Sequence, residues 1–222
     1  MAKRVLIIGG YGNFGSYIAT ALAKNKNVQL VIAGRSFDKA SRFADTLPAA
    51  KKPEARALDI FHDLSARLAD IDPDIVIHTS GPFQGQPPFV AEACIQQGCH
   101  YIDLADGREF VTAIDKLDQD AKNRGVLVVS GASSVPCLSS SLIDHYLPRF
   151  KTLTAVDYGI STAQKTNRGL ATTAAILSYV GKPFKTLRDG RVQDVFGWQS
   201  LHSRSFPGLG KRLLGNCDIP DL

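Results

Sequence analysis

The sequence lacks the long apolar runs that direct a chain into a membrane. Its first such run, Val5 to Ile8, is interrupted by Gly9 and Gly10. A secretory signal needs about 7–15 consecutive apolar residues, and a membrane-spanning helix needs about 18 or more. We therefore expect a cytoplasmic protein that has no membrane partner.

Cysteine is scarce, and its few copies lack the spacing of a metal site. The four cysteines form no CxxC pair, and no pair of histidines lies at a zinc-finger distance from them. They are Cys94, Cys99, Cys137 and Cys217. We expect free, buried thiols of a reducing compartment, and no metal ion.

Basic residues do not cluster either, although they outnumber the acidic ones by 26 to 21. The densest pairs, Lys51-Lys52 and Lys211-Arg212, have no aromatic residues interleaved with them. Nucleic-acid binding calls for a basic patch, so the net charge of +5 fits small anionic ligands better.

Several catalytic motifs are missing as well. No tyrosine has a lysine four residues later, which excludes the usual Tyr-x-x-x-Lys pair of short-chain dehydrogenases. The P-loop pattern, HExxH and GxSxG are also absent. None of the five histidines has a spacing that assigns it to catalysis, and we expect His78 to be a core residue. The catalytic residues are therefore left unassigned.

Short β-branched apolar runs alternate with helical patterns between residues 4 and about 130. The expected strands span residues 4–8, 28–33, 55–59, 74–79, 101–104 and 126–130. The expected helices span residues 14–23, 38–47, 63–69, 89–97 and about 111–124. Buried strands separated by helices are typical of a parallel sheet covered on both faces. We therefore predict an α/β, Rossmann-type doubly wound domain over residues 1–133.

This rhythm ends after Gly131. The sequence then predicts a helix over 138–147, a strand over 153–160 and a helix over 171–180. The segment Arg188 to Arg191 reads Arg-Asp-Gly-Arg, which is typical of a hairpin turn between two strands. We expect residues 134–222 to form a partial, mixed α+β substrate domain.

A glycine-rich motif joins the first predicted strand to the first predicted helix. Gly10, Gly12 and Gly15 form a GxGxxG pattern, with Asn13 and Phe14 between the last two. The first glycine permits a tight turn, the second lets the backbone approach a pyrophosphate, and the third lets the helix pack closely on the strand. Free amides at the helix N-terminus then bind the anion. In this strand-to-helix context the motif predicts dinucleotide binding.

The end of the second strand indicates which dinucleotide is bound. NAD sites place an Asp or Glu about 20 residues after the motif, where it holds the ribose 2′-hydroxyl. Here that position carries Arg35, followed by Ser36. A guanidinium pairs with a 2′-phosphate, and a serine hydroxyl adds a donor. We therefore predict NADP rather than NAD or S-adenosylmethionine, with a solvated arginine at a strand end as the alternative.

The fourth strand is expected to lie opposite the glycine motif, because strands one and four flank the ligand-binding switch point of a doubly wound sheet. It is followed by Ser80, Gly81 and Pro82, which we expect to contact the cofactor. Phe83 comes next and is a candidate for the substrate side. A Gly-Pro turn without a ligand is the alternative.

Two aspartates end predicted strands at the same edge of the sheet. Asp59 ends the third strand, where it lies beside the adenine or caps a loop. Asp103 ends the fifth strand, where it positions the substrate or the nicotinamide ribose, or caps the following loop.

These segments together resemble the saccharopine dehydrogenase family, in its NADP-binding-domain branch. The resemblance is carried by residues 9–15, 33–36, 80–83, 91–94 and 98–103. The string from Ala93 to Asp103 fits the family pattern ACxxxGxHYxD, which is more specific than the glycine motif.

The resemblance covers residues 4–135 and implies an NADP-binding domain followed by a substrate domain, usually in a homodimer. It implies amino-acid adducts such as saccharopine, or related amines and imines, as substrates. The family's second domain is longer than residues 134–222, so we expect this part to be incomplete.

The combined prediction is an NADP-dependent oxidoreductase that transfers hydride to or from a carbon–nitrogen or carbon–oxygen centre of a small molecule. The alternative is a non-catalytic NADP-binding sensor or scaffold, because no acid or base is assigned.

Overall fold

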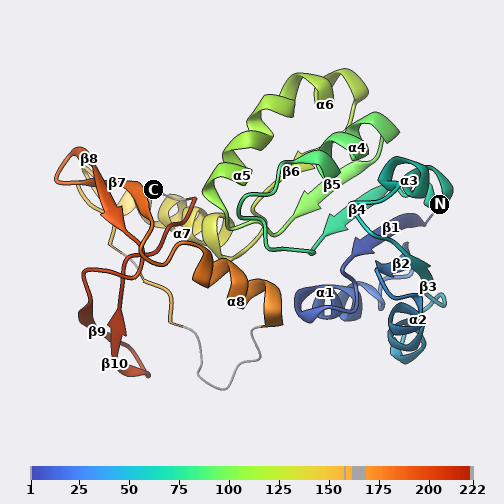
Figure 1. Cartoon of the computed structure of the whole chain (residues 1–222), viewed down its shortest axis with the longest axis horizontal. Coiled ribbons are helices and arrows are strands. Elements are labelled where there is room, and N and C mark those ends of the chain that lie inside the picture. The colour runs from blue at the N-terminus through green and yellow to red at the C-terminus, as the bar shows by residue number, and fades with distance from the viewer. Residues whose placement is uncertain (1, 158, 162–168, 221–222) are drawn as a thin grey trace.

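Six parallel strands form one sheet that organises the first part of the chain (Figure 1). The computed structural model describes residues 2–157, 159–161 and 169–220. The strands are β1 (Lys3–Ile8), β2 (Val28–Gly34), β3 (Glu54–Ala57), β4 (Ile75–His78), β5 (His100–Asp103) and β6 (Val128–Val129). Their order, β3-β2-β1-β4-β5-β6, places the switch point of a doubly wound sheet between β1 and β4. The predicted fold class is confirmed.

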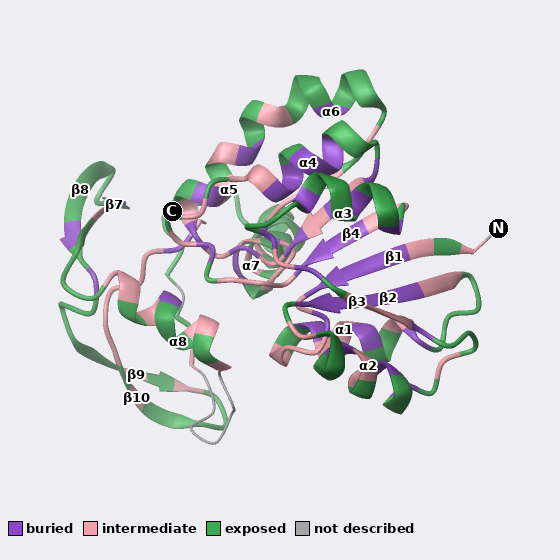
Figure 2. Cartoon of the chain, turned by 45° about the vertical axis from the view of Figure 1, so that its right-hand side comes forward, coloured by how far each residue is buried: buried purple, intermediate pink, exposed green. Residues whose placement is uncertain are grey.

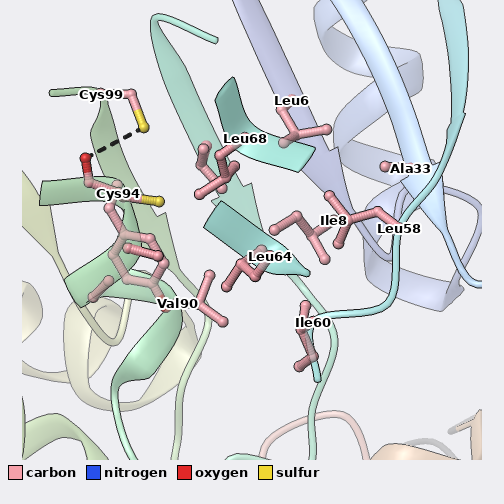
Figure 3. Packing of buried hydrophobic residues seen from close by; sticks show 14 of the residues in the cluster. Leu6, Ile8, Ala33, Leu58, Ile60, Leu64, Leu68, Val90, Cys94 and Cys99 are labelled. Carbon is pink, nitrogen blue, oxygen red and sulfur yellow. Dashed lines mark hydrogen bonds between the residues drawn. The ribbon is translucent and has the colours of Figure 1, made fainter. Parts of the chain in front are cut away.

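Helices cover both faces of this sheet. They are α1 (Asn13–Leu22), α2 (Phe37–Thr46), α3 (Leu64–Ile71), α4 (Phe89–Gln97), α5 (Arg108–Ile114) and α6 (Asp118–Arg124). Alternate residues of a strand point to opposite faces, so β1 contributes to two separate cores. Leu6 and Ile8 pack with the α3 and α4 side of the sheet, as Figure 3 shows, whereas Val5 and Ile7 pack with α1 and α2. The central strands are accordingly buried, and the outer faces of the helices are exposed (Figure 2).

Three sequence predictions in this part need correction. The helix expected over 111–124 begins earlier, at Arg108, and is divided by a 3₁₀ turn over Asp115–Leu117. At Leu117, which packs against the core, φ is −91° and ψ is −2°, so the regular helix is interrupted before α6 begins. The strands expected over 55–59 and 126–130 are shorter and end at Ala57 and Val129, where pairing with their neighbours stops.

The second part of the chain is mixed, as expected, and contains small elements. They are a π-type turn (Ser134–Leu138), α7 (Ser139–Tyr146), a 3₁₀ turn (Leu147–Arg149), α8 (Gly169–Ser178), β7 (Pro183–Arg188), β8 (Arg191–Phe196), β9 (His202–Phe206) and β10 (Gly210–Leu214). β7 pairs with β8 and β9 pairs with β10, each as an antiparallel pair. The turn predicted at 188–191 is confirmed, and α7 and α8 match the two predicted helices.

The strand expected over residues 153–160 is wrong for the positions that the structure describes, 153–157, 159 and 160. A strand requires a hydrogen-bonded neighbour, and no strand pairs with these residues. Their apolar side chains, Leu153, Val156 and Ile160, are exposed instead of alternating between a core and solvent. The predicted division at residues 133 and 134 stays a prediction.

The cysteines are free, but they are not all buried. Cys94 and Cys99 lie inside the core, where the Cys99 thiol contacts the Cys94 carbonyl oxygen at 3.5 Å (Figure 3). Cys137 is exposed and Cys217 is half-buried, because both lie in the second part, outside the sheet core. None of the described helices has the length and apolar character needed to cross a membrane.

Candidate functional site

The glycine motif forms a tight loop between β1 and α1. Gly9, rather than Gly10, adopts the left-handed conformation, with φ +79°. A side chain at Gly9 would also lie 2.6 Å from the Ser80 hydroxyl. The turn therefore depends on a glycine one position before the GxGxxG pattern. The double glycine Gly9-Gly10 is the signal in the sequence that points to it.

Gly12 and Gly15 bring the N-terminus of α1 close to the end of β1. Gly12 is the N-cap of α1, and no side chain caps the helix there. A Cβ at Gly15 would lie 2.2 Å from the Gly9 carbonyl oxygen, so only glycine permits this approach. The first-turn amides of a helix have no partners within the helix, and here they face the switch point of the sheet. This cradle fits the pyrophosphate of a dinucleotide.

We expect Gly15→Ala to destabilise the protein by about 3 kcal/mol and to weaken NADPH binding at least tenfold, because the added methyl group forces the loop and helix apart. Urea unfolding and a fluorescence titration measure the two effects. Gly107→Ala is the control, because its Cβ would meet the nearest atom, the Gln84 nitrogen, at an ordinary 3.4 Å. Wild-type stability and affinity in Gly15→Ala would contradict this role.

Arg35 lies directly beyond β2, at the same edge of the sheet as the glycine loop. Its side chain is exposed, and no hydrogen bond or ion pair with its guanidinium occurs in the described part of the chain. Ser36 is the N-cap of α2, and its hydroxyl oxygen accepts a hydrogen bond from the Lys39 amide at 3.3 Å. The serine hydrogen and the guanidinium thus remain available to an anion placed beside them.

Asp59 lies two residues beyond the end of β3, in the loop before α3. One carboxylate oxygen accepts the Phe61 amide at 3.1 Å, and the other lies 3.2 Å from His62 Nδ1. The pKa of Asp59 is lowered by the Phe61 amide, and His62 and Arg35 add to this effect. Asp59 therefore caps its own loop and also lies within electrostatic reach of Arg35; contact with adenine stays a prediction.

The segment after β4 faces the glycine loop, as predicted. The Thr79 hydroxyl donates to the Ile8 carbonyl oxygen at 2.9 Å, which ties the two strand ends together. Ser80 and Gly81 are half-buried, and Pro82 is exposed. Phe83 is buried and packs against the rings of His78 and Phe110. The roles predicted for these residues toward cofactor and substrate stay predictions.

Asp103 is fully buried at the end of β5. Its Oδ1 accepts three hydrogen bonds of 2.9 Å, from the Ala105 amide, the Ser130 hydroxyl and the Gly131 amide. Burial raises the pKa of Asp103, although these hydrogen bonds oppose the effect. The contacts match the loop-capping alternative, because they hold the loops after β5 and β6 together.

His78 is a buried neighbour of this carboxylate, as expected of a core histidine. Its Nδ1 lies 3.1 Å from the Tyr101 hydroxyl, and Asp103 lies near the same hydroxyl. Burial lowers the pKa of His78 to about 4, with partial opposition from a hydrogen bond to the Ser80 backbone. The imidazole is therefore neutral near pH 7.

We expect a fall in pH to destabilise the wild type more than it destabilises the His78→Asn variant. The unfolded histidine takes up a proton as the pH falls through 6.5, whereas the folded one does so near 4, so folding is penalised within this window. Lowering the pH from 7 to about 4.5 should cost the wild type about 2–3 kcal/mol more than the variant. Urea unfolding at both pH values measures this difference. The raised pKa of Asp103 acts in the opposite direction but is present in both proteins. Equal losses would contradict the prediction.

A cleft of about 90 Å³ opens beside the glycine loop, between the two parts of the chain. The residues that line it are Phe14, Thr79, Gly81, Pro82, Phe83, Leu104, Asp106, Ser133, Ala171, Thr172 and Ala175. Asp106 is the one member of this set with an ionisable side chain, and its Oδ1 accepts the Gln84 amide at 3.0 Å. Sequence reasoning missed it, although Asp106 follows Asp103 in the loop at the carboxyl end of β5.

Helix α8 forms the far wall of this cleft. Its Ala171, Thr172 and Ala175 face a pocket whose other walls come from residues 14–133. Gly169, at its first turn, lies beside the Asn13 side chain. A larger open groove, of about 540 Å³, lies between α3 and α4, but it contains none of the predicted site residues. Among the residues that the structure describes, no cluster of His, Cys, Asp and Glu is suited to a metal ion.

The family model of the saccharopine dehydrogenase NADP-binding domain matches residues 5–129. The chain belongs to this family. The match includes the glycine loop, Arg35 and Asp106, and it ends with the last strand of the parallel sheet. The first part of the chain is therefore an NADP-binding domain, and the predicted cofactor is confirmed.

Solved structures with a similar fold include three enzymes. Biliverdin reductase from Synechocystis sp. PCC 6803, in complex with biliverdin and NADP+, is 23% identical over 65% of this chain and 42% of its own, with a TM-score of 0.43. Amine dehydrogenase from Mycobacterium smegmatis is 20% identical over 58% and 38%, with a TM-score of 0.43. Dihydrodipicolinate reductase from Paenisporosarcina sp. TG-14, bound to dipicolinate, is 20% identical over 59% and 47%, with a TM-score of 0.43.

This chain spans less than half the length of each of those three proteins. No curated protein matches it in sequence. The assignment of the NADP-binding domain therefore depends on the family match and on the strand order, and the three structures add no argument about activity.

Proposed function

We propose that this saccharopine dehydrogenase family member is an NADP-dependent oxidoreductase that transfers hydride to or from a carbon–nitrogen or carbon–oxygen centre. The observation that carries the proposal is the cleft at the switch point, which is lined by Phe14 of the glycine motif, by the segment after β4 and by a single carboxylate, Asp106. The family resemblance adds the substrate class, an amine or imine derived from an amino acid.

The cofactor cradle is built by three segments at one edge of the sheet. The glycine loop receives the pyrophosphate, and the exposed Arg35 with Ser36 receives the 2′-phosphate. Ser80 lies opposite the glycine loop, close to Gly9, and Gly81 follows it. NADPH, when bound, supplies the hydride.

Asp106 is the candidate for moving the proton. Oxidation of an amine or alcohol removes a hydride from carbon and a proton from nitrogen or oxygen, so the site needs a group that accepts this proton. The Asp106 carboxylate accepts it, and the resulting acid returns it in the reduction direction. Gln84 holds one carboxylate oxygen at 3.0 Å, which orients the group toward the cleft.

The other side chains that line the cleft are of two kinds, polar and apolar. Thr79, Ser133 and Thr172 offer hydroxyl groups, whereas Phe83 and Leu104 offer apolar surface. Such a mixture suits a small polar substrate with an aliphatic portion. The homodimer implied by the resemblance stays a prediction. A surface that a second copy could cover is offered by α7, which has no buried residue and exposes apolar side chains.

The experiment is a turnover assay of the protein with NADPH and a panel of imines and 2-oxo acids paired with amines, followed at 340 nm. The reverse direction uses NADP+ and secondary-amine adducts of amino acids. Cofactor oxidation that depends on one class of substrate is the expected result. Tight NADPH binding without turnover across the panel would overturn the catalytic assignment.

That outcome would favour the second candidate, a non-catalytic NADP-binding sensor or scaffold. One observation supports this candidate: the cleft, at about 90 Å³, is smaller than the roughly 300–1,000 Å³ of ordinary small-molecule sites. Protection of α8 from hydrogen exchange on addition of NADPH, without turnover, would support this sensor or scaffold role.

A further inference from the structure

We propose that Tyr11 is the positioning residue that sets the preference for NADPH over NADH, because it holds the turn that presents Arg35. This inference rests on the proposed role of Arg35 toward the 2′-phosphate. Tyr11 occupies the variable position between Gly10 and Gly12, where the GxGxxG pattern specifies no residue type.

The Tyr11 ring lies directly over the end of β2. A Cβ at Gly34 would be 2.6 Å from ring atom Cε1 and 2.8 Å from the hydroxyl oxygen. Gly34 therefore leaves the space that the ring fills. The ring also packs against the core cluster formed by β1, β2, α1 and α2, and this contact further restricts its position.

The Tyr11 hydroxyl holds the other side of Arg35. Its oxygen accepts a hydrogen bond from the Ser36 amide at 3.1 Å. Ser36 in turn caps α2 through Lys39. The backbone of Arg35 is thus fixed on both sides, by the ring at Gly34 and by the hydroxyl at Ser36, while its guanidinium stays exposed.

This arrangement links the two halves of the cofactor cradle. The loop whose glycines receive the pyrophosphate also carries Tyr11, and Tyr11 fixes the backbone position from which the Arg35 side chain extends toward the ribose. A preorganised clamp binds its anion more tightly than one that must be ordered on binding. NADH has no 2′-phosphate and makes no use of the clamp, so the Tyr11 contact should act on NADPH alone.

The test compares the ratio of the NADH and NADPH dissociation constants in wild type, Tyr11→Phe and Tyr17→Phe. Tyr11→Phe keeps the ring and removes the hydrogen bond, and we expect the preference for NADPH to fall about fivefold. Tyr17 is 75% exposed on α1 and serves as the matched control, with an unchanged ratio. A merely structural role would weaken both cofactors equally, and that outcome would overturn the proposal.

A double-mutant cycle with Arg35→Ala shows whether Tyr11 acts through Arg35. In the Arg35→Ala background, Tyr11→Phe should leave the ratio unchanged. A further fivefold loss there would show that Tyr11 acts independently, against the proposal. If the wild type itself binds both cofactors equally, the role assigned to Arg35 fails. If the wild type prefers NADPH and Tyr11→Phe keeps that preference, Tyr11 alone fails.

Discussion

Replacing Asp106 by Asn is expected to slow hydride transfer by about 10²–10⁴-fold, because the cleft then lacks a group that accepts or returns the proton. The asparagine amide is close to the carboxylate in shape, so its oxygen can accept the hydrogen bond that the Gln84 side-chain amide donates to Asp106. The affinity for NADPH should stay within about twofold, because binding depends on the glycine loop and Arg35.

The rate is measured as single-turnover cofactor oxidation with the best substrate of the panel. Asp120→Asn is the matched control, because Asp120 is exposed on α6 and outside the cleft. Asp106→Glu keeps the carboxylate and should recover part of the rate. If Asp106→Asn turns over at the wild-type rate, the proton moves through another group, and the assignment of Asp106 is wrong.

Changing Arg35 to Asp is expected to weaken NADPH binding about 100-fold, through the loss of a charge-assisted contact of about 1.5–3 kcal/mol and the repulsion that replaces it. The new carboxylate would lie near Asp59, which already feels the charge of Arg35. A 2′-phosphate would therefore meet two negative side chains. NADH should bind as well as before or better, because a carboxylate at this position holds a ribose 2′-hydroxyl in NAD sites.

Fluorescence titration with both cofactors measures this change at fixed ionic strength, because exposed charges are screened by salt. Arg42→Asp is the matched control, since it makes the same change of charge at an exposed position of α2. Equal weakening of NADPH by the two variants would show a general electrostatic effect. Equal NADPH affinity in wild type and Arg35→Asp would remove Arg35 from the site.

Local patterns were sufficient to predict the parallel sheet and the cofactor loop. β1 and β2 contain continuous apolar runs because both of their faces are covered. Such a run can be recognised in the sequence without knowing which helices cover it. The glycine motif was equally readable, because Gly12 and Gly15 serve contacts within a few residues of themselves. Gly15 against the Gly9 carbonyl oxygen is the clearest case.

Patterns failed where a segment depended on a distant partner. The apolar residues of 153–160 suggested a strand, but a strand exists only when another edge is there to pair with it. Asp103 had two possible roles in the sequence, contact with the substrate or nicotinamide ribose and capping of the following loop, and local pattern did not choose between them. Two of its hydrogen bonds come from Ser130 and Gly131, which lie 27 and 28 positions away, and nothing near Asp103 in the sequence indicates them.

The sequence by itself thus determined the fold of the NADP-binding domain and the type of cofactor, because those follow from strand periodicity, glycines at short spacing and one arginine. The tertiary structure alone decided which side chains share the cleft. Asp106 and Ala175 of α8 line the same cleft although they lie far apart in the sequence, and the Tyr11 hydroxyl accepts a hydrogen bond from the Ser36 amide across 25 positions. Contacts of that kind depend on how whole elements pack, and no local pattern records them.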